Sequence, residues 1–328
     1  MTGPSMTAVV QSAYGTSEVF EVSEVPVPAV GDGDVLVRVR ATSVNAADLH
    51  LMSGLPRIIR LMGYGMRAPK SRVRGVDIAG VVEAIGTGVT SFRPGDEVFA
   101  QVHDGGFAEL VLVPQALLAA KPANLTFEQA AAVPLAANTA LQGLRDRGEL
   151  APGQTVLING ASGGVGTFAV QLAKAFGAEV TGVCSSRNVE LVRSLGADHV
   201  IDYSRADFAT GDVRYDVVLD LVANRSLAAL RRAVAPTGTL VLSGGNGGDW
   251  LGPIPMILAA YALSPFSKQQ LRPLTETPSA ANLEYLAGLL EAGTIAPAIE
   301  RTFALGEAAA ALHHLDTEHA RGKVVITV

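Results

Sequence analysis

The segment QTVLINGASGGVG, residues 154–166, decides the fold of this chain. Its first part, Thr155 to Asn159, is apolar and β-branched and follows a Pro-Gly turn, so it predicts a short buried strand. Glycines follow at positions 163, 164 and 166. Residues 167–176 then predict a helix with one apolar face, which Gly177 ends. The order is therefore strand, glycine turn, helix.

This order favours the binding of a pyrophosphate. Backbone N–H groups and the positive end of the helix dipole meet at the turn, where they stabilise an anion. The glycines let the main chain approach such a ligand and let the helix approach the sheet. A glycine fingerprint by itself is weak, and the alternative is a turn that binds nothing.

The residues after the turn favour the first of these two interpretations. They alternate predicted strands and helices at short intervals, which indicates a parallel, doubly wound sheet. The predicted strands are residues 178–184, 199–203, 216–221 and 239–243, with a helix at 189–195. A glycine turn within such a series of βαβ units is typical of a dinucleotide-binding domain.

Composition excludes several classes of protein. The 328 residues are 48% hydrophobic and 17% charged, as in a compact α/β protein of one or two domains. The net charge is −6 without a basic block, so we expect no nucleic-acid partner. No apolar run reaches the ~18 residues of a membrane span, so we expect no membrane partner. The single cysteine, Cys184, excludes an internal disulfide and favours a cytoplasmic location.

The segments on either side of this domain have other patterns. Residues 8–114 contain short strand patterns between Gly and Pro turns, which predict a barrel-like β domain. Within it, residues 35–40 alternate apolar and charged side chains, as in a half-buried antiparallel strand. Residues 126–147 predict a helix that Pro134 interrupts. Towards the C-terminus we expect helices at 253–263, 280–291 and 307–315, and strands at 269–277, 296–304 and 323–328.

Five short motifs carry a family resemblance. They are the Ser43–Asn45 turn, the Arg93–Val98 turn, the Gly160–Gly166 loop, and the segments Leu195–Asp198 and Ala320–Val325. Together they resemble the medium-chain dehydrogenase/reductase superfamily, within it the zinc-independent quinone oxidoreductase (zeta-crystallin-like) branch. The resemblance implies an α/β fold with a GroES-like β-barrel domain, residues 1–124 and 277–328. A Rossmann NADP-binding domain, a doubly wound parallel sheet, would occupy residues 125–276, and the active site would lie in the cleft between the two.

The positions of the catalytic zinc ligands in related alcohol dehydrogenases hold other residues here. Asn45 stands in place of a cysteine ligand and Val76 in place of a histidine ligand. The third ligand position falls near Ala136 or Ala137. Catalytic zinc needs three N, S or O ligands, and valine and alanine offer none. We therefore expect no metal.

The resemblance implies three residues near the reacting atoms. The Asn45 position lies beside the nicotinamide in the family, where it can hydrogen-bond a substrate carbonyl or order a water. His50 stands where relatives carry a tyrosine or a relay histidine, so it is a candidate proton donor. Its alternative role is a cap on a short helix. Thr139 matches a position that packs behind the nicotinamide, and its alternative role is purely structural.

The second strand of the nucleotide domain points to NADPH. An NAD enzyme usually ends this strand with a carboxylate that binds the ribose hydroxyls. Here no carboxylate occurs until Glu190. Ser185 and Arg187 follow the strand instead, and hydroxyl and guanidinium groups suit a 2′-phosphate.

Further cofactor residues are implied by the resemblance. Lys174 and Tyr203 match positions near the 2′-phosphate, although an exposed helix lysine is an equally simple interpretation of Lys174. The other candidates come from the loop, the fifth strand and the C-terminal segment: Ser162, Gly163, Gly164, Val165, Ser243, Gly244, His319, Ala320 and Arg321.

The expected activity is hydride transfer from NADPH to a quinone or an α,β-unsaturated carbonyl. One alternative is an enoyl-thioester reductase, and another is a catalytically weak NADPH-binding sensor or interaction protein. The basic segment 57–74 either binds anionic acceptors or is a solvated, mobile face, and the second interpretation is the simpler one. The resemblance also implies a homodimer formed through the edge strand 269–277.

Overall fold

The computed structural model describes residues 3–244, 248–318 and 320–328. The chain divides into two compact units. One contains residues 1–138, 278–293 and 297–328, and the other contains residues 139–277 and 294–296. The predicted boundary at 124/125 differs from this division, because α2 (Phe127–Ala131) packs against the barrel strands and so belongs to the first unit.

The second unit is built on one parallel sheet, as the alternating pattern predicts. Its strand order is β10-β9-β8-β11-β12-β13, and every pair in it is parallel. This is the order of a doubly wound dinucleotide-binding sheet. The strands are β8 (Thr155–Asn159), β9 (Glu179–Cys184), β10 (His199–Asp202), β11 (Tyr215–Asp220), β12 (Val234–Leu242) and β13 (Gln270–Pro273). The predicted edge strand 269–277 is thus an edge strand, but a shorter one.

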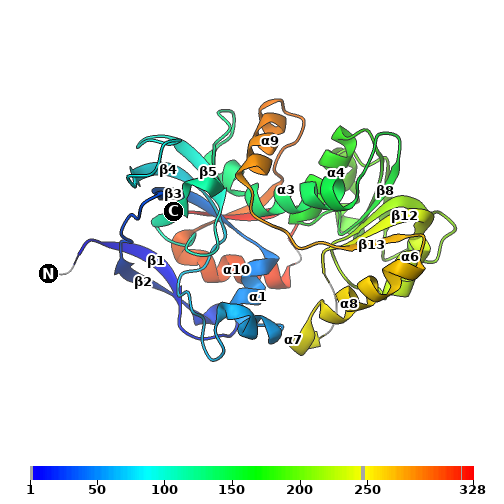
Figure 1. Ribbon diagram of the computed structural model, residues 1–328, viewed down its shortest axis with the longest axis horizontal. Helices are drawn as coiled ribbons and strands as arrows, with labels where there is room; N and C mark the ends of the chain where they lie inside the picture. The colour runs from blue at the N-terminus through cyan, green and yellow to red at the C-terminus, as the bar shows by residue number, and fades with distance from the viewer. Residues whose placement is uncertain (1–2, 245–247, 319) are drawn as a thin grey trace. The chain divides into compact units, whose positions relative to one another are not determined.

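Helices cover both faces of this sheet (Figure 1). They are α4 (Gly164–Ala175), α5 (Val189–Ser194), α6 (Leu227–Ala233) and α8 (Ile254–Leu263), and the short helix α7 (Gly248–Leu251) precedes α8. The predicted start of the first helix, at Thr167, is wrong by one turn. The chain becomes helical at Gly164, because glycine propensity is overridden where the turn must bring the helix onto the sheet.

The first unit is a curved, mostly antiparallel sheet of order β14-β15-β3-β4-β5-β7, with β6 paired to β3 and a separate β1-β2 ribbon. Its strands are β1 (Ser5–Gln11), β2 (Phe20–Pro26), β3 (Asp34–Val44), β4 (Asp77–Ile85), β5 (Glu97–Gln101), β6 (Leu110–Pro114), β7 (Leu118–Ala120), β14 (Ile299–Ala304) and β15 (Lys323–Thr327). Because β15 pairs with β3, the C-terminal strand completes a sheet made by the N-terminal part of the chain.

The central strand β3 extends further towards the C-terminus than its sequence pattern predicts. Val35, Val37 and Val39 point into one apolar cluster, whereas Leu36 joins a second cluster with residues of β1. Arg38 on that second face is partly exposed, and Arg40 is exposed. The expectation of a half-buried antiparallel strand at residues 35–40 is therefore confirmed, apart from the burial of Leu36.

The remaining helices of the first unit are α1 (Ala46–Ser53), α9 (Ala280–Glu291) and α10 (Ala308–Thr317). The predicted break at Pro134 is confirmed, because α3 (Pro134–Leu141) begins there and a π-helical turn (Gln142–Arg147) follows it. The helix predicted at 280–291 is found with the same bounds. Within the described part of the chain, no helix has the length and hydropathy that crossing a membrane requires.

Candidate active site

The loop between β8 and α4 leaves a helix N-terminus open. Gly160 adopts a left-handed φ of 91°, and the backbone N–H groups of Gly160 and Ala161 donate to the Val183 carbonyl of β9. Gly163 is the N-cap residue of α4 and has no side chain with which to cap it, and the first turn holds no acidic residue. The first N–H groups of the helix are thus available to an anion.

Two glycines of the loop have different steric roles. A Cβ on Gly166 would collide with the Gly160 carbonyl oxygen and the Ala161 backbone, so this glycine permits the close approach of α4 to the loop. A Cβ on Gly163 would meet nothing nearer than the Gly160 carbonyl oxygen at 3.5 Å. The space in front of Gly163 is therefore open, and the loop fits the pyrophosphate of a dinucleotide.

Polar side chains gather at the carboxyl edge of the sheet. The Asn159 amide donates to Asp220 Oδ1 over 2.7 Å, and the Asn188 amide donates to Ser162 Oγ over 2.9 Å. Burial raises the pKa of Asp220. Our sequence reasoning did not single out Asp220, although its position near the end of a predicted strand beside the glycine loop is a usable signal.

The candidates for the 2′-phosphate lie after β9 and β10. Arg187 is exposed, and Tyr203 is 52% exposed. Beside them is a carboxylate that the sequence argument missed: Asp202 accepts a hydrogen bond of 2.5 Å from Ser186 Oγ. This bond, followed by one from Ser204, lowers the pKa of Asp202. Asp202 ends the neighbouring strand β10, and the parallel pairing of β10 with β9 places it opposite Cys184.

The Lys174 side chain is paired with other groups of the nucleotide-binding unit. Its ammonium forms an ion pair of 2.8 Å with Asp198 and donates to the Ala178 carbonyl over 3.2 Å. The Asp198 carboxylate also accepts from the backbone N–H of Val180. Lys174 is therefore a partly exposed, ion-paired residue and not a simple exposed helix lysine, and its part in phosphate binding stays a prediction.

The C-terminal candidates fall into three groups. Ser243 follows β12 and donates its backbone N–H to the Asp220 carbonyl over 3.0 Å, with Gly244 next to it. His319 lies outside the described residues. Arg321 belongs to the first unit, where its backbone N–H donates to Glu300 over 2.9 Å and its guanidinium forms an ion pair of 3.3 Å with the same carboxylate.

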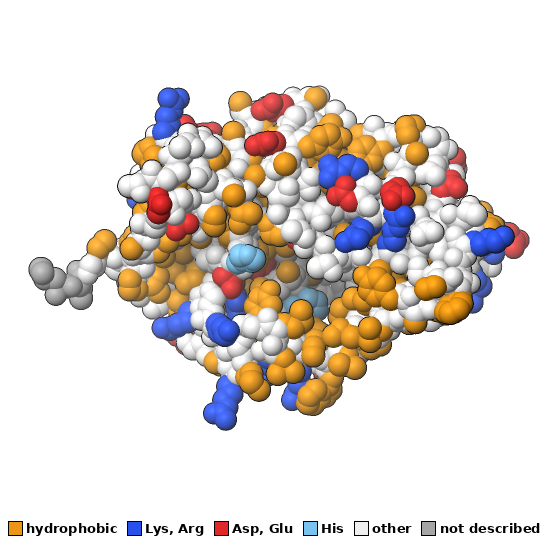
Figure 2. Space-filling model, in the orientation of Figure 1, with side chains coloured by type: hydrophobic (Ala, Val, Ile, Leu, Met, Phe, Trp, Pro, Cys, Tyr) orange, Lys and Arg blue, Asp and Glu red, His pale blue; other side chains and the backbone are white. Residues whose placement is uncertain are grey.

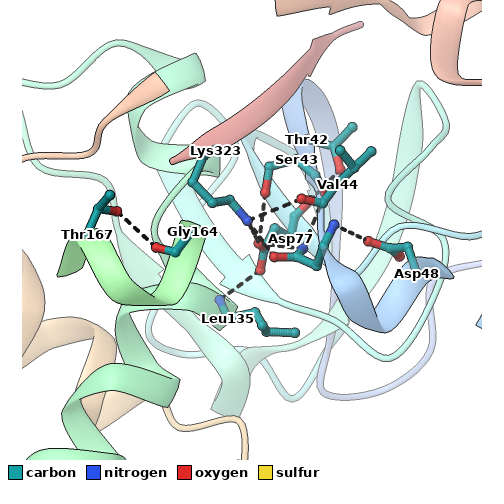
Figure 3. Close-up of polar contacts among 10 residues, drawn as sticks. Thr42, Ser43, Val44, Asp48, Asp77, Leu135, Gly164, Thr167 and Lys323 are labelled. Carbon is teal, nitrogen blue, oxygen red and sulfur yellow. Dashed lines mark hydrogen bonds and ion pairs between the residues drawn. The ribbon is translucent and has the colours of Figure 1, made fainter. Parts of the chain in front are cut away.

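The first unit holds a buried polar centre around Asp77 (Figure 3), and Asn45 belongs to it through a hydrogen bond to Asp77. Asp77 Oδ2 accepts from Ser43 Oγ over 2.8 Å and from the Asn45 amide over 3.0 Å. Its Oδ1 accepts from the backbone N–H of Leu135 over 2.8 Å. Lys323 forms an ion pair of 3.4 Å with Asp77 and also donates to Asn45 Oδ1.

This centre fixes the orientation of the Asn45 side chain. Lys323 is a donor only, so it must face Oδ1, and the amide N–H groups then point to Asp77 and, over 3.4 Å, to the Ser43 carbonyl. Both N–H groups have acceptors within the protein. Of the two roles that the resemblance implies for Asn45, the ordering of a water through Oδ1 suits this geometry better than donation to a substrate carbonyl.

Lys323 is the main residue of this centre that sequence reasoning missed. Burial lowers the pKa of its ammonium, and the nearby Asp77 and Asp48 carboxylates oppose this effect. In the sequence, Lys323 is notable only as part of the C-terminal motif Ala320–Val325. Nothing in a single sequence indicates that a lysine from residue 323 meets an asparagine at residue 45, because the contact depends on the pairing of β15 with β3.

Asp48 and His50 lie on α1, which Asn45 begins. Asp48 accepts the Asn45 backbone N–H over 2.8 Å, and burial raises the pKa of its carboxyl to about 7. His50 is exposed and its Nδ1 lies 3.0 Å from the Leu55 carbonyl. Nε2 of a neutral ring is then the free acceptor. Thr139 is 6% exposed within α3.

The positions that correspond to the zinc ligands of related alcohol dehydrogenases do not form a set of metal ligands in this structure. Val76, Ala136 and Ala137 are buried, and Asn45 is held by Lys323 and Asp77. Across residues 3–244, 248–318 and 320–328, no three His, Cys, Asp or Glu side chains are grouped to hold a metal ion.

A doubly wound sheet with an open, glycine-rich helix N-terminus, joined to a barrel-like unit, defines a nicotinamide-dependent oxidoreductase. Residues 31–123 match the alcohol dehydrogenase GroES-like domain family, and residues 195–326 match the zinc-binding dehydrogenase family. The chain belongs to the medium-chain dehydrogenase/reductase superfamily, in its zinc-independent quinone oxidoreductase branch.

Individual relatives agree with this assignment. The chain is 32% identical to the chloroplast envelope quinone oxidoreductase homolog of Arabidopsis thaliana, over 99% of both chains. It is also 32% identical to the NADPH-dependent alkenal/one oxidoreductase of the same plant, over 98% of this chain and 79% of that one. The solved structure of the quinone oxidoreductase from Coxiella burnetii superposes with a TM-score of 0.86 at 28% identity, over 99% and 100% of the two chains.

Proposed function

We propose that this protein reduces quinones or α,β-unsaturated carbonyl compounds with NADPH, without a metal. The observation that carries the proposal is the uncapped N-terminus of α4, which faces open space at Gly163. The names of the relatives support the substrate class. A bound reduced nicotinamide supplies the hydride in such reactions.

The residues of the chain divide this work between the two units. In the second unit, the N–H groups of Gly164 and Val165 would hold the pyrophosphate, with Ser162 fixed by Asn188 beside them. Arg187, Ser185 and Tyr203 would contact the adenosine ribose and its phosphate. In the first unit, the pair of Lys323 and Asp77 holds Asn45 Oδ1 in one orientation, ready to order a water or a hydroxyl group.

The preference for NADPH rests on Arg187 and on the lack of a carboxylate at the end of β9. The Asp202 carboxylate weakens that argument, because a fixed negative charge near a 2′-phosphate is repulsive. Its hydrogen bonds to Ser186 and Ser204 turn it towards these hydroxyls. We therefore propose NADPH as the preferred cofactor, with Asp202 limiting the degree of preference.

The absorbance of reduced nicotinamide tests the function directly. NADPH oxidation is measured with a naphthoquinone, an alkenal and crotonyl-CoA in parallel. Turnover of the first two above that of crotonyl-CoA is the expected result. Faster turnover of crotonyl-CoA would identify an enoyl-thioester reductase instead. Saturable NADPH binding without turnover of any acceptor would favour a sensor or interaction protein.

We also propose that the protein is a cytoplasmic homodimer. The edge strand β13 ends the sheet on one side, and hydrophobic side chains gather over α7 and α8 near it (Figure 2). Trp250, Leu258, Tyr261 and Phe266 are 60 to 90% exposed. Apolar side chains beside an unpaired strand edge suit a self-complementary interface.

A further inference from the structure

A cavity of about 320 Å³ lies in the first unit, outside the residues assigned so far. It forms where the basic segment after α1 meets the connection between β5 and β6. Its walls hold three side chains that can be cationic and one carboxylate. The lining residues are Met62, Gly63, Tyr64, Lys70, Ser71, Arg74, His103 and Asp104.

Arg74 forms the inner wall of this cavity and corrects our interpretation of the basic segment. It is 1% exposed, so it does not belong to a solvated face. Its Nε donates to Gln11 over 3.1 Å, and its Nη1 donates to both oxygens of Asp104 over 3.1 and 3.2 Å. Its Nη2 is buried and has no hydrogen-bond partner among the described residues.

An unmatched guanidinium nitrogen is costly in a protein interior. Leaving a buried donor without an acceptor typically costs ~1–3 kcal/mol, and more for a charged group. Guanidinium groups bind carboxylates and phosphates through two parallel N–H donors. The Asp104 carboxylate takes both its bonds from Nη1, so the Nη2 donors remain for a further acceptor.

The charges around the cavity favour an anion. Lys70 and His103 are exposed at its opening, with Ser71 between Lys70 and Arg74 in the chain. Asp104 offsets one positive charge, and burial raises the pKa of its carboxyl although Arg74 opposes that effect. Arg74 and Lys70 together outnumber this single carboxylate. Met62 is 69% exposed and provides an apolar rim.

We propose that this cavity binds an oxyanion, a carboxylate or a phosphate group, carried by the acceptor. The proposal rests on the proposed reductase function. It narrows the acceptor to a molecule with an electron-poor double bond and an anionic group at some distance from it. Arg74 Nη2 and Lys70 are the donors for that group.

Hydrogen bonds link Arg74 in the cavity wall to the C-terminal end of α1, the helix that Asn45 caps at its N-terminus. Gln11, which accepts from Arg74, also donates its amide to the Met52 carbonyl at the end of α1 over 2.7 Å. Asn45 is the N-cap residue of that helix. The Asp104 charge contributes to the raised pKa of Asp48 on the same helix. An anion held at Arg74 therefore lies beside the helix that Asn45 begins.

The decisive experiment compares one enone as its terminal carboxylic acid and as its methyl ester, using the full chain and NADPH. We expect a higher kcat/KM for the acid, and a loss of about three- to tenfold of this preference in Lys70→Gln, as for removal of one charged contact. Arg67→Gln is the matched control, because Arg67 is exposed in the same segment but does not line the cavity. Asp104→Asn should increase the preference.

Equal kcat/KM values for acid and ester in the wild type, or equal losses in Lys70→Gln and Arg67→Gln, would overturn the proposal. Naphthoquinone reduction in the same preparations shows whether the reductase function itself stands. If no acceptor is turned over, titration calorimetry with inorganic phosphate and with hexanoate still tests whether the cavity binds an oxyanion. Binding that is weakened by Lys70→Gln but not by Arg67→Gln would support the oxyanion site. The probe that binds, inorganic phosphate or hexanoate, shows whether the site prefers a phosphate or a carboxylate. Absence of binding overturns it.

Discussion

The Asp48 side chain is fully buried in the first unit. It packs near Asp77, Lys323 and Asp104, and its Oδ1 has no partner among the described residues. Burial is the largest cause of its raised pKa, about 7 against an ordinary 3.8. The folded state therefore binds a proton that the unfolded chain releases between these two pH values.

This difference predicts a pH dependence of stability. The contribution of protonated Asp48 is complete below about pH 4 and is lost as pH rises through about 7, because only the folded state holds the proton in that range. At ~1.4 kcal/mol per pH unit, the upper bound is ~4 kcal/mol. Asp48→Asn keeps the shape without the charge, so its free energy of unfolding should change less between pH 4 and 8. Urea unfolding at several pH values checks this, and parallel curves for the two proteins would refute it.

Cofactor choice is a second question at the residue scale. Arg187→Asp places a carboxylate where a 2′-phosphate would lie, so it should shift the ratio of NADPH to NADH affinity towards NADH by at least about tenfold. Asp202→Asn removes the opposing charge and should shift the ratio the other way. Fluorescence titration with both cofactors measures it. Equal affinities of the wild type for NADH and NADPH would contradict the assignment.

At the scale of elements, the loop between β8 and α4 allows binding and stability to be separated. Gly163→Ala places a methyl group in open space with a φ of −81°, so the fold should keep its melting temperature while the methyl blocks the pyrophosphate. Gly166→Ala forces α4 away from the Gly160 carbonyl, and should cost ~1–3 kcal/mol of stability as overpacking does. Calorimetric melting with and without NADPH distinguishes them. An unchanged NADPH affinity in Gly163→Ala would place the dinucleotide elsewhere.

The elements also show what a single sequence can predict. The strands β8, β9 and β11 and the helix α9 were predicted within about one residue, because buried apolar runs and helix caps are local signals. The start of α4 was not, because the helical state of Gly164 and Gly166 depends on packing against the sheet. The contacts of Lys323 and Asp202 could not be predicted either, since each depends on which strands become neighbours.

For the whole molecule, the apolar surface beside β13 predicts an assembly. Phe266 is 90% exposed, and Trp250, Leu258 and Tyr261 of the same surface are exposed as well. A contiguous exposed apolar patch often marks a protein–protein interface. Phe266→Asp should shift sedimentation from a dimer towards a monomer. Lys268→Asp, two residues further on, is the control: it also introduces a carboxylate but removes no apolar side chain. A wild-type protein that sediments as a monomer at micromolar concentration would refute the dimer.

The central claim is hydride transfer by a dinucleotide held at α4, with no metal involved. The most direct test is NADPH oxidation with a naphthoquinone, measured on one preparation before and after exhaustive chelation, with metal content determined alongside. We predict the same rate in both samples, and far less than one zinc per chain. A rate that is lost on chelation and restored by zinc would contradict the account.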